Sequence, residues 1–137
     1  RLYQVEAYLS TARWAMQALT RHFWDPKHEG IYWSVDAAGN PVNDRKHVYA
    51  QAFSIYGLSA YYQATGENEA LQLATRLFEL IDLHTYDPQF GGNIECRARD
   101  WSHLEDMRLS SIDLNSTTLH DKCNSLAHRV LCRFHVR

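Results

Sequence analysis

The spacing of apolar residues predicts three helices in the first two thirds of the chain. In 8–23 and 68–81, apolar residues recur every three or four positions on one side and polar residues occupy the other, which is typical of a half-exposed outer helix. Between them, 46–65 is apolar nearly all round, which is typical of an inner helix enclosed by other helices. We expect Gly66 to end the inner helix and Asn68 to cap the next one. The apolar positions of the two outer helices are Tyr8, Ala12, Ala15, Met16, Leu19 and Phe23, then Ala70, Leu71, Ala74, Leu77, Phe78 and Ile81.

Two segments of the chain repeat each other without a gap. HFWDPKHEG begins at His22, and HTYDPQFGG begins at His84, 62 residues later. Each contains an aromatic residue, Asp and Pro, followed by glycine and a short β-like run at 31–35 or 93–96. Proline fixes φ, and glycine permits the positive φ of a tight turn. The repeat therefore predicts two copies of one loop, each leading into a small β-hairpin.

The order of these elements predicts an all-α fold with short β-hairpin loops. An outer helix, a hairpin loop and an inner helix are followed by a second outer helix, a second loop and a segment where a second inner helix is due. This alternation, with the loops at one end, describes part of an α/α toroid. Six helix pairs of ordinary length need well over roughly 150 residues, and the chain has 137. We therefore expect a fragment of an (α/α)6 barrel, with the toroid domain at 1–115.

Residues 116–137 predict a different kind of helix, which we interpret as a divergent tail. Apolar residues recur at three and four, but the opposite side is strongly polar, as in a surface helix. The tail also contains five potential metal ligands, namely His120, Cys123, His128, Cys132 and His135. Cys123 lies on the apolar side, and the spacing matches no compact zinc knuckle. We therefore predict no metal site.

Composition narrows the class of protein. The 14 Lys and Arg are scattered among 16 Asp and Glu, for a net charge of −2, so no basic stripe for nucleic acid is expected. No run approaches the roughly 18 apolar residues of a membrane span. Three cysteines, an odd number, argue against a disulfide framework and favour a cytoplasmic location. The 4 Trp and 8 Tyr can stack on sugars, although filling helical cores is their commoner use.

Three blocks of the sequence resemble one enzyme family. HEGIYWSVDAAGNP at 28–41, DRKHVYAQAFSIYGLSAYYQATG at 44–66 and RDWSHLEDMRLSSIDLN at 99–115 are similar to the cellobiose 2-epimerase branch of the N-acylglucosamine 2-epimerase superfamily. The resemblance covers about 2–115 and implies a toroid of six α/α pairs. It also implies a cofactor-independent isomerase that inverts C2 of the reducing-end sugar of a β-1,4 disaccharide such as cellobiose, mannobiose or lactose. After Asn115, the family's Asn-Thr-His-Leu-His run is missing.

The implied reaction defines what the site needs. Once the sugar ring opens, the C2 proton lies α to an aldehyde, and its removal gives an enediolate that can be reprotonated on the other face. Two bases that work near neutral pH are needed, for which histidine is suited, and hydrogen-bond donors must stabilise the enediolate oxygens. In the family, the histidine pair belongs to later inner helices. We therefore expect no catalytic residue in this chain, and an inactive fragment.

Two residues are candidates for binding the sugar. The resemblance implies that Tyr49, in the KHVYAQ block, is an inward tyrosine that contacts the sugar; the alternative is an aromatic residue that fills the core. It also implies that Asp113 is a loop aspartate near the sugar; the alternative is a turn or N-cap residue. Arg45, Lys46 and His47 are interpreted as solvated rather than facing the mouth of the barrel. His47 is expected to point away from Tyr49, because two helical residues turn about 200°.

Two other functions stay open from the sequence. The first is another carbohydrate enzyme on the same toroid, either an aldose–ketose isomerase or a glycoside hydrolase. The second is a non-enzymatic helical interaction fragment, whose uncovered inner-helix surface favours self-association. The expected partner is therefore a disaccharide or monosaccharide substrate, with self-association as the alternative.

Overall fold

The computed structural model describes residues 6–89 and 91–104. The elements in chain order are α1 (Glu6–Ala18), the π-helical turn η2 (Leu19–Phe23), β1 (Ser34–Val35), β2 (Pro41–Asn43), β3 (Lys46–His47), α2 (Val48–Thr65), α3 (Asn68–Thr85) and β4 (Cys96–Arg97). Within these ranges, no helix combines the length and apolar character that crossing a membrane requires. Asp113, the boundary predicted at 115 and the predicted tail at 116–137 lie outside the described residues.

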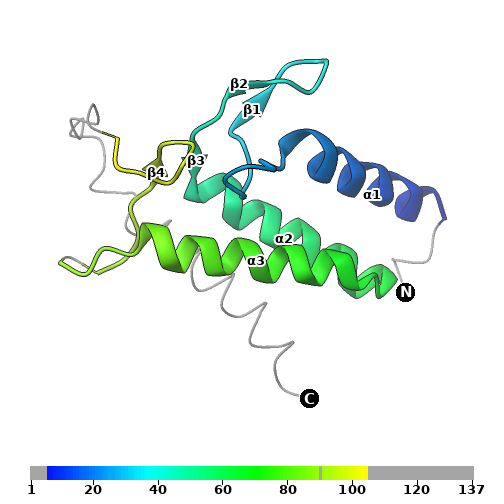
Figure 1. The fold of residues 1–137 in the computed structure, drawn as a ribbon. Coiled ribbons are helices and arrows are strands. Elements are labelled where there is room, and N and C mark those ends of the chain that lie inside the picture. Colours follow the sequence, from blue (N-terminus) through cyan, green and yellow to red (C-terminus); the bar gives the residue numbers. More distant parts are fainter. Residues whose placement is uncertain (1–5, 90, 105–137) are drawn as a thin grey trace.

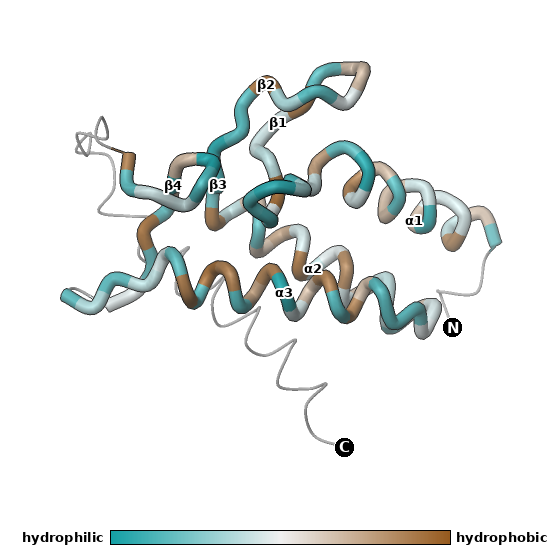
Figure 2. The backbone as a smooth tube through the Cα atoms, in the orientation of Figure 1, coloured by the Kyte–Doolittle hydropathy of each residue, from teal (hydrophilic) through white to brown (hydrophobic). Residues whose placement is uncertain are grey.

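The three helices pack side by side with α2 in the middle. Figure 1 shows α2 and α3 running next to each other in opposite directions, with α1 on the other side of α2 and the strands gathered near the start of α2. Figure 2 shows hydrophobic and hydrophilic residues alternating along α3, whereas the tip between β1 and β2 combines hydrophilic residues with residues of intermediate hydropathy. The predicted order of outer, inner and outer helix is confirmed, and the fold is that of an α/α toroid fragment with short strands in its loops.

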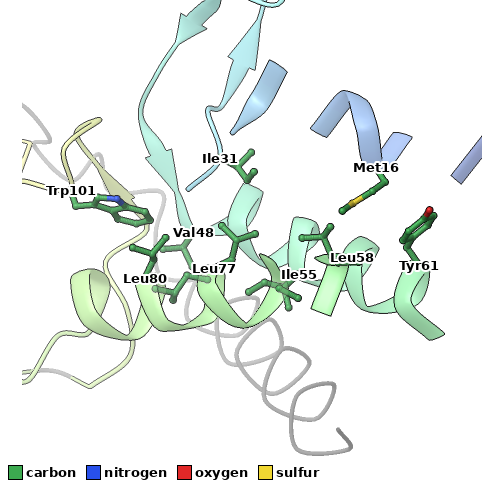
Figure 3. Close-up of a cluster of buried hydrophobic side chains, with 12 residues drawn as sticks. Met16, Ile31, Val48, Ile55, Leu58, Tyr61, Leu77, Leu80 and Trp101 are labelled. Carbon is green, nitrogen blue, oxygen red and sulfur yellow. The ribbon is translucent and has the colours of Figure 1, made fainter. Parts of the chain in front are cut away.

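The core fills the space between the helices. Ile55 of α2 and Leu77 of α3 have no exposed surface, and Figure 3 shows them with Val48 between the two helices. Met16 of α1 packs on the other side of α2, and Trp101 closes the core at the end near the strands. Each fully buried aliphatic side chain contributes about 1.5–3 kcal/mol relative to an exposed one. The α2–α3 interface therefore contributes most of the hydrophobic stabilisation in the described part of the chain.

The predicted apolar faces of the two outer helices are buried to different extents. In α3, Ala70, Ala74 and Leu77 are completely buried, as predicted. In the first outer segment, Met16 is buried and Ala12, Leu19 and Phe23 are partly buried against the core, but Tyr8 is 65% exposed. The reason is geometric, because α1 and α2 leave between them an open apolar groove of about 720 Å³. The periodicity identified the right side of α1 but not its exposure.

The inner helix α2 is covered on two sides rather than all round. Ile55 and Leu58 are buried, whereas Tyr49, Phe53 and Tyr56 are 44%, 52% and 52% exposed. This uncovered side agrees with the expectation for a fragment, and the full enclosure of the helix in the whole toroid stays a prediction. Among the described helices, α1 and α3 cover two sides of α2. The third side, at the spacing i, i+4 and i+7, is an aromatic surface.

The turn between α2 and α3 has one of its two predicted caps. Gly66 ends α2 in the left-handed conformation, with φ at 76°, and its N–H donates to the carbonyl of Tyr62 at 2.7 Å, as predicted. Asn68 is not the N-cap of α3. It is the first helical residue, and the N-cap is Glu67, which makes no side-chain capping bond. The Glu67 N–H instead donates to the Thr65 hydroxyl at 3.2 Å.

The predicted repeat is confirmed by the backbone. The N–H groups of Asp25 and Asp87 donate to the carbonyls of Gly30 and Gly92, both at 2.9 Å. Each copy also has an antiparallel bridge between the residue before the aspartate and the residue after that glycine. The two outer helical segments, ending at Phe23 and Thr85, occupy equivalent positions before these loops. The η2 turn distinguishes the first copy, because α3 remains α-helical to its end.

The strands connect the two copies. β1 and β2 form the predicted hairpin in the first loop, with Ser34 opposite Asn43. In the second loop the described residues differ from the prediction, because β4 pairs with β3. This antiparallel pair places Lys46 opposite Arg97 and Cys96 opposite the residue that precedes α2. The start of the inner helix is thereby fastened to the second loop.

Candidate functional site

Four rings form a row at the end of the molecule where α2 begins. The aromatic row consists of Trp33, His47, Tyr49 and Phe53. Ring centroids are 4.3 Å apart for Trp33 and His47, 6.5 Å for Trp33 and Tyr49, and 4.6 Å for Tyr49 and Phe53. Trp33 and Tyr49 are both 44% exposed. Exposed aromatic side chains gathered in this way mark a binding surface more often than a core.

Tyr49, the first predicted sugar-binding residue, stands on the uncovered side of α2. Val48 and Ile55 of the same helix point into the core, whereas Tyr49 and Phe53 lie one turn apart on the opposite side. The exposure of Tyr49 argues against the alternative prediction that it fills the core. Asp113, the second predicted residue, lies outside the described residues.

His47 belongs to the aromatic row, contrary to the prediction that it points away from Tyr49. It lies in strand β3 and α2 begins one residue later, so the helical turn between positions 47 and 49 does not apply. Its Nε2 atom lies 3.4 Å from Sγ of Cys96. Burial is the main cause that lowers the pKa of His47. The imidazole is therefore neutral at pH 7 and supports Trp33 as an uncharged ring.

Lys46 is fully buried, so the prediction of a solvated side chain is wrong for this residue. Its Nζ donates to Oδ2 of Asp25 at 3.0 Å, and neither side chain has exposed surface. The Tyr32 ring lies 4.7 Å from the same nitrogen. A buried ammonium requires an opposite charge, and Asp25 supplies it. Of the three polar residues before α2, Arg45 alone is exposed.

The second loop also binds Asp25. Nε and Nη2 of Arg99 donate to the two carboxylate oxygens of Asp25 at 2.9 and 3.1 Å, and Nη2 donates to the Tyr32 hydroxyl at 2.9 Å. Burial alone would raise the pKa of Asp25, but hydrogen bonds from Arg99, the Lys27 amide and Lys46 outweigh it and lower the pKa far below its ordinary range. The carboxylate therefore stays charged and holds two cations that come from different segments.

We call Asp25, Tyr32, Lys46 and Arg99 the Asp25 cluster, and the sequence interpretation missed it. Two signals were present in the sequence: Asp25 is the repeated aspartate of the Asp-Pro pair, and Lys46 stands just before a helix with few charges. The cluster is joined to the aromatic row through the backbone, since Lys46 is the chain neighbour of His47 and Tyr32 is the chain neighbour of Trp33. It therefore fixes the backbone that carries the row.

Further side-chain contacts hold the first loop against α2 and against the second loop. The Gln51 side chain accepts the Ile31 N–H and donates to the Ile31 carbonyl, both at 2.7 Å. The indole of Trp101 donates to the His28 carbonyl at 2.9 Å. A Cβ atom at Gly30 would come within 2.6 Å of the Trp101 ring, and φ there is +78°. The loop fits only with glycine at this position.

The described part of the chain contains no group of three or more His, Cys, Asp or Glu side chains placed to hold a metal ion. The five potential ligands of the tail lie outside it. What the aromatic row offers a ligand is ring faces, one phenol and one neutral imidazole. These groups stack, donate and accept hydrogen bonds, and they suit a polar molecule with apolar faces such as a sugar.

Comparison with known proteins gives one consistent family. Residues 3–134 match the family model described as N-acylglucosamine 2-epimerase (GlcNAc 2-epimerase). The match extends beyond Asn115, where we expected the resemblance to stop, and the domain boundary predicted there stays a prediction. The chain is 43% identical to the cellobiose 2-epimerase of Bacteroides fragilis over 115 residues, which is 84% of this chain and 29% of that protein.

Solved structures agree with this comparison. The cellobiose 2-epimerase of Bacillus thermoamylovorans superimposes with a TM-score of 0.80 at 37% identity over 93% of this chain and 34% of that one. That of Spirochaeta thermophila has a TM-score of 0.80 at 34% identity, over 92% of this chain and 33% of the other. The chain thus spans about a third of the length of these relatives.

Proposed function

Because the chain belongs to the N-acylglucosamine 2-epimerase family, we propose that the whole protein is a sugar 2-epimerase and that this chain forms part of its sugar-binding wall. The proposed substrates are β-1,4 disaccharides such as cellobiose, mannobiose and lactose, epimerised at C2 of the reducing-end sugar. The observation that carries the proposal is the half-exposed Tyr49 in an open row of rings at the start of the inner helix.

The proposed chemistry needs no cofactor. After ring opening, one base takes the C2 proton and leaves an enediolate, and a second group returns a proton to the opposite face of C2. A histidine pair supplies both groups in this proposal, and it belongs to the part of the protein beyond this chain. The proposed setting is the reducing cytoplasm, and the support for it is that the described cysteine, Cys96, is a free thiol.

In this proposal, Tyr49 and Asp113 bind the substrate. The Tyr49 hydroxyl donates to a sugar oxygen and its ring contacts the sugar, and its support is the exposure of Tyr49 beside Trp33. Asp113 accepts from a sugar hydroxyl, and its support is the resemblance of the block at 99–115 alone. The chain by itself binds sugar weakly and has no turnover, because both proton-transfer groups are outside it.

The test follows the C2 hydrogen by NMR in deuterated water. The whole protein, incubated with cellobiose, should exchange the C2 proton for deuterium and accumulate the C2 epimer, while the chain alone should match a buffer blank. Accumulation of a ketose would instead assign an aldose–ketose isomerase, because the same enediolate is then reprotonated at C1. Sustained exchange by the chain alone would refute its inactivity.

A second candidate function is self-association of this chain through its apolar groove. The groove between α1 and α2 is lined by apolar side chains from both helices, including Ala12, Met16, Phe53 and Leu58. Exposed apolar surface of this kind favours a partner. Sedimentation velocity over a range of concentrations discriminates, because a monomer at all concentrations would exclude this candidate and leave the proposed epimerase unaffected.

A further inference from the structure

We propose that Trp33 determines specificity for disaccharides, by stacking on the pyranose ring that does not react. This inference rests on the proposed function. Trp33 is 44% exposed and stands between the first loop and α2, where its ring contacts both His47 and Tyr49. It was not among the residues that the sequence pointed to. Its position in the aromatic row, next to the proposed substrate residue Tyr49, indicates a role in binding.

The indole of Trp33 is held in place from behind. Its ring centroid lies 4.3 Å from that of His47, with the planes tilted by 41°. His47 is itself fixed by Cys96, whose Sγ lies 3.4 Å from Nε2, and by the pairing of β3 with β4. The neighbouring Lys46 is locked to Asp25. A ring supported in this way loses little freedom when a ligand binds, so its stacking energy contributes nearly in full to affinity.

The exposed surface of the indole suits a closed sugar ring. A β-linked glucopyranose carries its hydroxyls around the edge, and its C–H groups point to the two faces, so each face is apolar and flat enough to stack on an aromatic ring. The reacting sugar cannot be held in this way throughout catalysis. Its ring must open before the C2 proton becomes acidic, and an open chain presents no flat face.

The two rings of a β-1,4 disaccharide therefore need different partners. The closed ring needs a stacking surface, and the opened ring needs hydrogen-bond donors that follow the developing charge. Trp33 offers the first and the phenol of Tyr49 offers the second, with their ring centroids 6.5 Å apart. This separation is comparable with the span of one sugar ring, so adjacent rings of one disaccharide can engage both residues.

Steady-state kinetics of the whole protein on cellobiose tests this assignment. In Trp33→Ala, KM should rise roughly 5- to 20-fold with kcat within about twofold of the parent, because stacking on the unreactive ring is the same in the ground state and the transition state. Trp33→Phe should recover part of the loss. With glucose as substrate, which has no second ring, Trp33→Ala should lower kcat/KM by much less than it does with cellobiose.

Trp14→Ala is the matched control. Trp14 is 70% exposed but lies on α1, outside the aromatic row, and its removal should change neither substrate's constants. Three results for Trp33→Ala would each overturn the inference. They are equal losses of kcat/KM for cellobiose and glucose, a fall in kcat that follows a fall in Tm, and an unchanged KM for cellobiose.

A second measurement separates this inference from the proposed function. Methyl β-cellobioside has both rings locked closed and cannot react, so it probes stacking alone. In NMR of the whole protein, it should shift the indole signal of Trp33 and leave that of Trp14 in place. If the whole protein has no epimerase activity but this shift is seen, the proposed function fails and the Trp33 surface stands. If activity is present but the shift is absent, the Trp33 inference fails and the proposed function stands.

Discussion

The two loop copies, 24–40 and 86–102, share a backbone but use their side chains differently. Their left-handed positions coincide, since positive φ occurs at Glu29 and Gly91 and at Gly39 and Trp101, each pair 62 residues apart. The same local hydrogen bonds close both turns. A common backbone therefore tolerates glycine or a large side chain at equivalent points. The burial and the partners of equivalent side chains differ between the two copies, because the rest of the fold surrounds each copy differently.

The repeated aspartates show this difference most clearly. Asp25 accepts the Lys27 N–H at 3.0 Å, and Asp87 accepts the Gln89 N–H at 2.9 Å, so both make the same local turn. Asp25 has no exposed surface and holds the charged Lys46, whereas Asp87 is half-buried. The local turn is a property of the repeated sequence. The burial of Asp25 is a property of its long-range partners.

The aromatic partners of the loops differ in the same way. In the first copy, His22 packs against Gly39, where a Cβ atom would come within 2.1 Å of its Nδ1. In the second copy, His84 stacks on Trp101 with ring centroids 5.0 Å apart. One copy makes room for the histidine with a glycine, and the other covers it with an indole that also closes the core.

Removing the charge of Asp25 should have the largest effect on stability. Asp25→Asn leaves the buried ammonium of Lys46 without a counter-ion, which typically costs about 3–5 kcal/mol. Asp87→Asn is the matched control and should cost about 1 kcal/mol, because water can solvate a half-exposed side chain. Urea denaturation measures both. Equal losses for the two variants would contradict the comparison, and Asp25→Asn combined with Lys46→Met should recover part of the loss.

Low pH should lower the free energy of unfolding through Asp25. The pKa of Asp25 is lower in the folded chain than its ordinary value of 3.8, so its stabilising contribution is complete above about pH 4 and is lost as the pH falls below that. One such group changes stability by about 1.4 kcal/mol per pH unit. Asp25→Asn should flatten the fall between pH 4 and pH 2. A residual slope is expected, because Arg76 lowers the pKa of Glu29 as well. An unchanged slope would contradict the assignment.

A side chain at Gly39 should have an intermediate effect. Gly39→Ala places a Cβ at φ +88° and against the His22 ring, which should cost about 2–3 kcal/mol. In a His22→Ala background the clash disappears and only the backbone strain stays, so the cost of Gly39→Ala should fall to about 1 kcal/mol. A double-mutant cycle read by thermal unfolding measures the difference. Additive effects would show that His22 is not the obstacle.

The repeat and the helix order could be predicted from the sequence because both are local patterns. The Asp-Pro-Gly loops, the apolar spacing of α3 and the Gly66 cap follow from residues close together in the chain. The burial of Lys46 could not be predicted in this way, because its partners are Asp25, 21 positions before it in the chain, and a loop that carries Arg99.

The aromatic row could be foreseen only at Tyr49, and the reason is the same. Tyr49 stood out through its sequence block, and its exposure agrees with a binding role, although its sugar contact stays a prediction. His47 was misplaced because helical geometry was applied one residue too early, and the strand that contains it pairs with β4 from the second loop. Trp33 lies in the block at 28–41 that carries the resemblance, but no role was assigned to it from the sequence. Its importance is visible only once the rings of two segments are side by side.

The smallest effect on stability should come from Tyr49, and it bears on the central claim that this face binds the sugar. Tyr49→Phe, made in the whole protein, keeps the ring and removes a hydroxyl, which for one donor is worth about 0.5–1.5 kcal/mol or more as charge develops on the sugar. Because Tyr49 is 44% exposed, the change should leave Tm within experimental error. Turnover of cellobiose should fall at least several-fold.

The measurement is the rate of C2 epimerisation of cellobiose by the parent and by Tyr49→Phe, with the Tm of both recorded alongside. The expected result is a several-fold lower rate at an unchanged Tm. Full activity in Tyr49→Phe, together with a Tyr49→Ala variant that loses the roughly 3–5 kcal/mol typical of a core aromatic, would show that Tyr49 is a packing residue and would contradict the account.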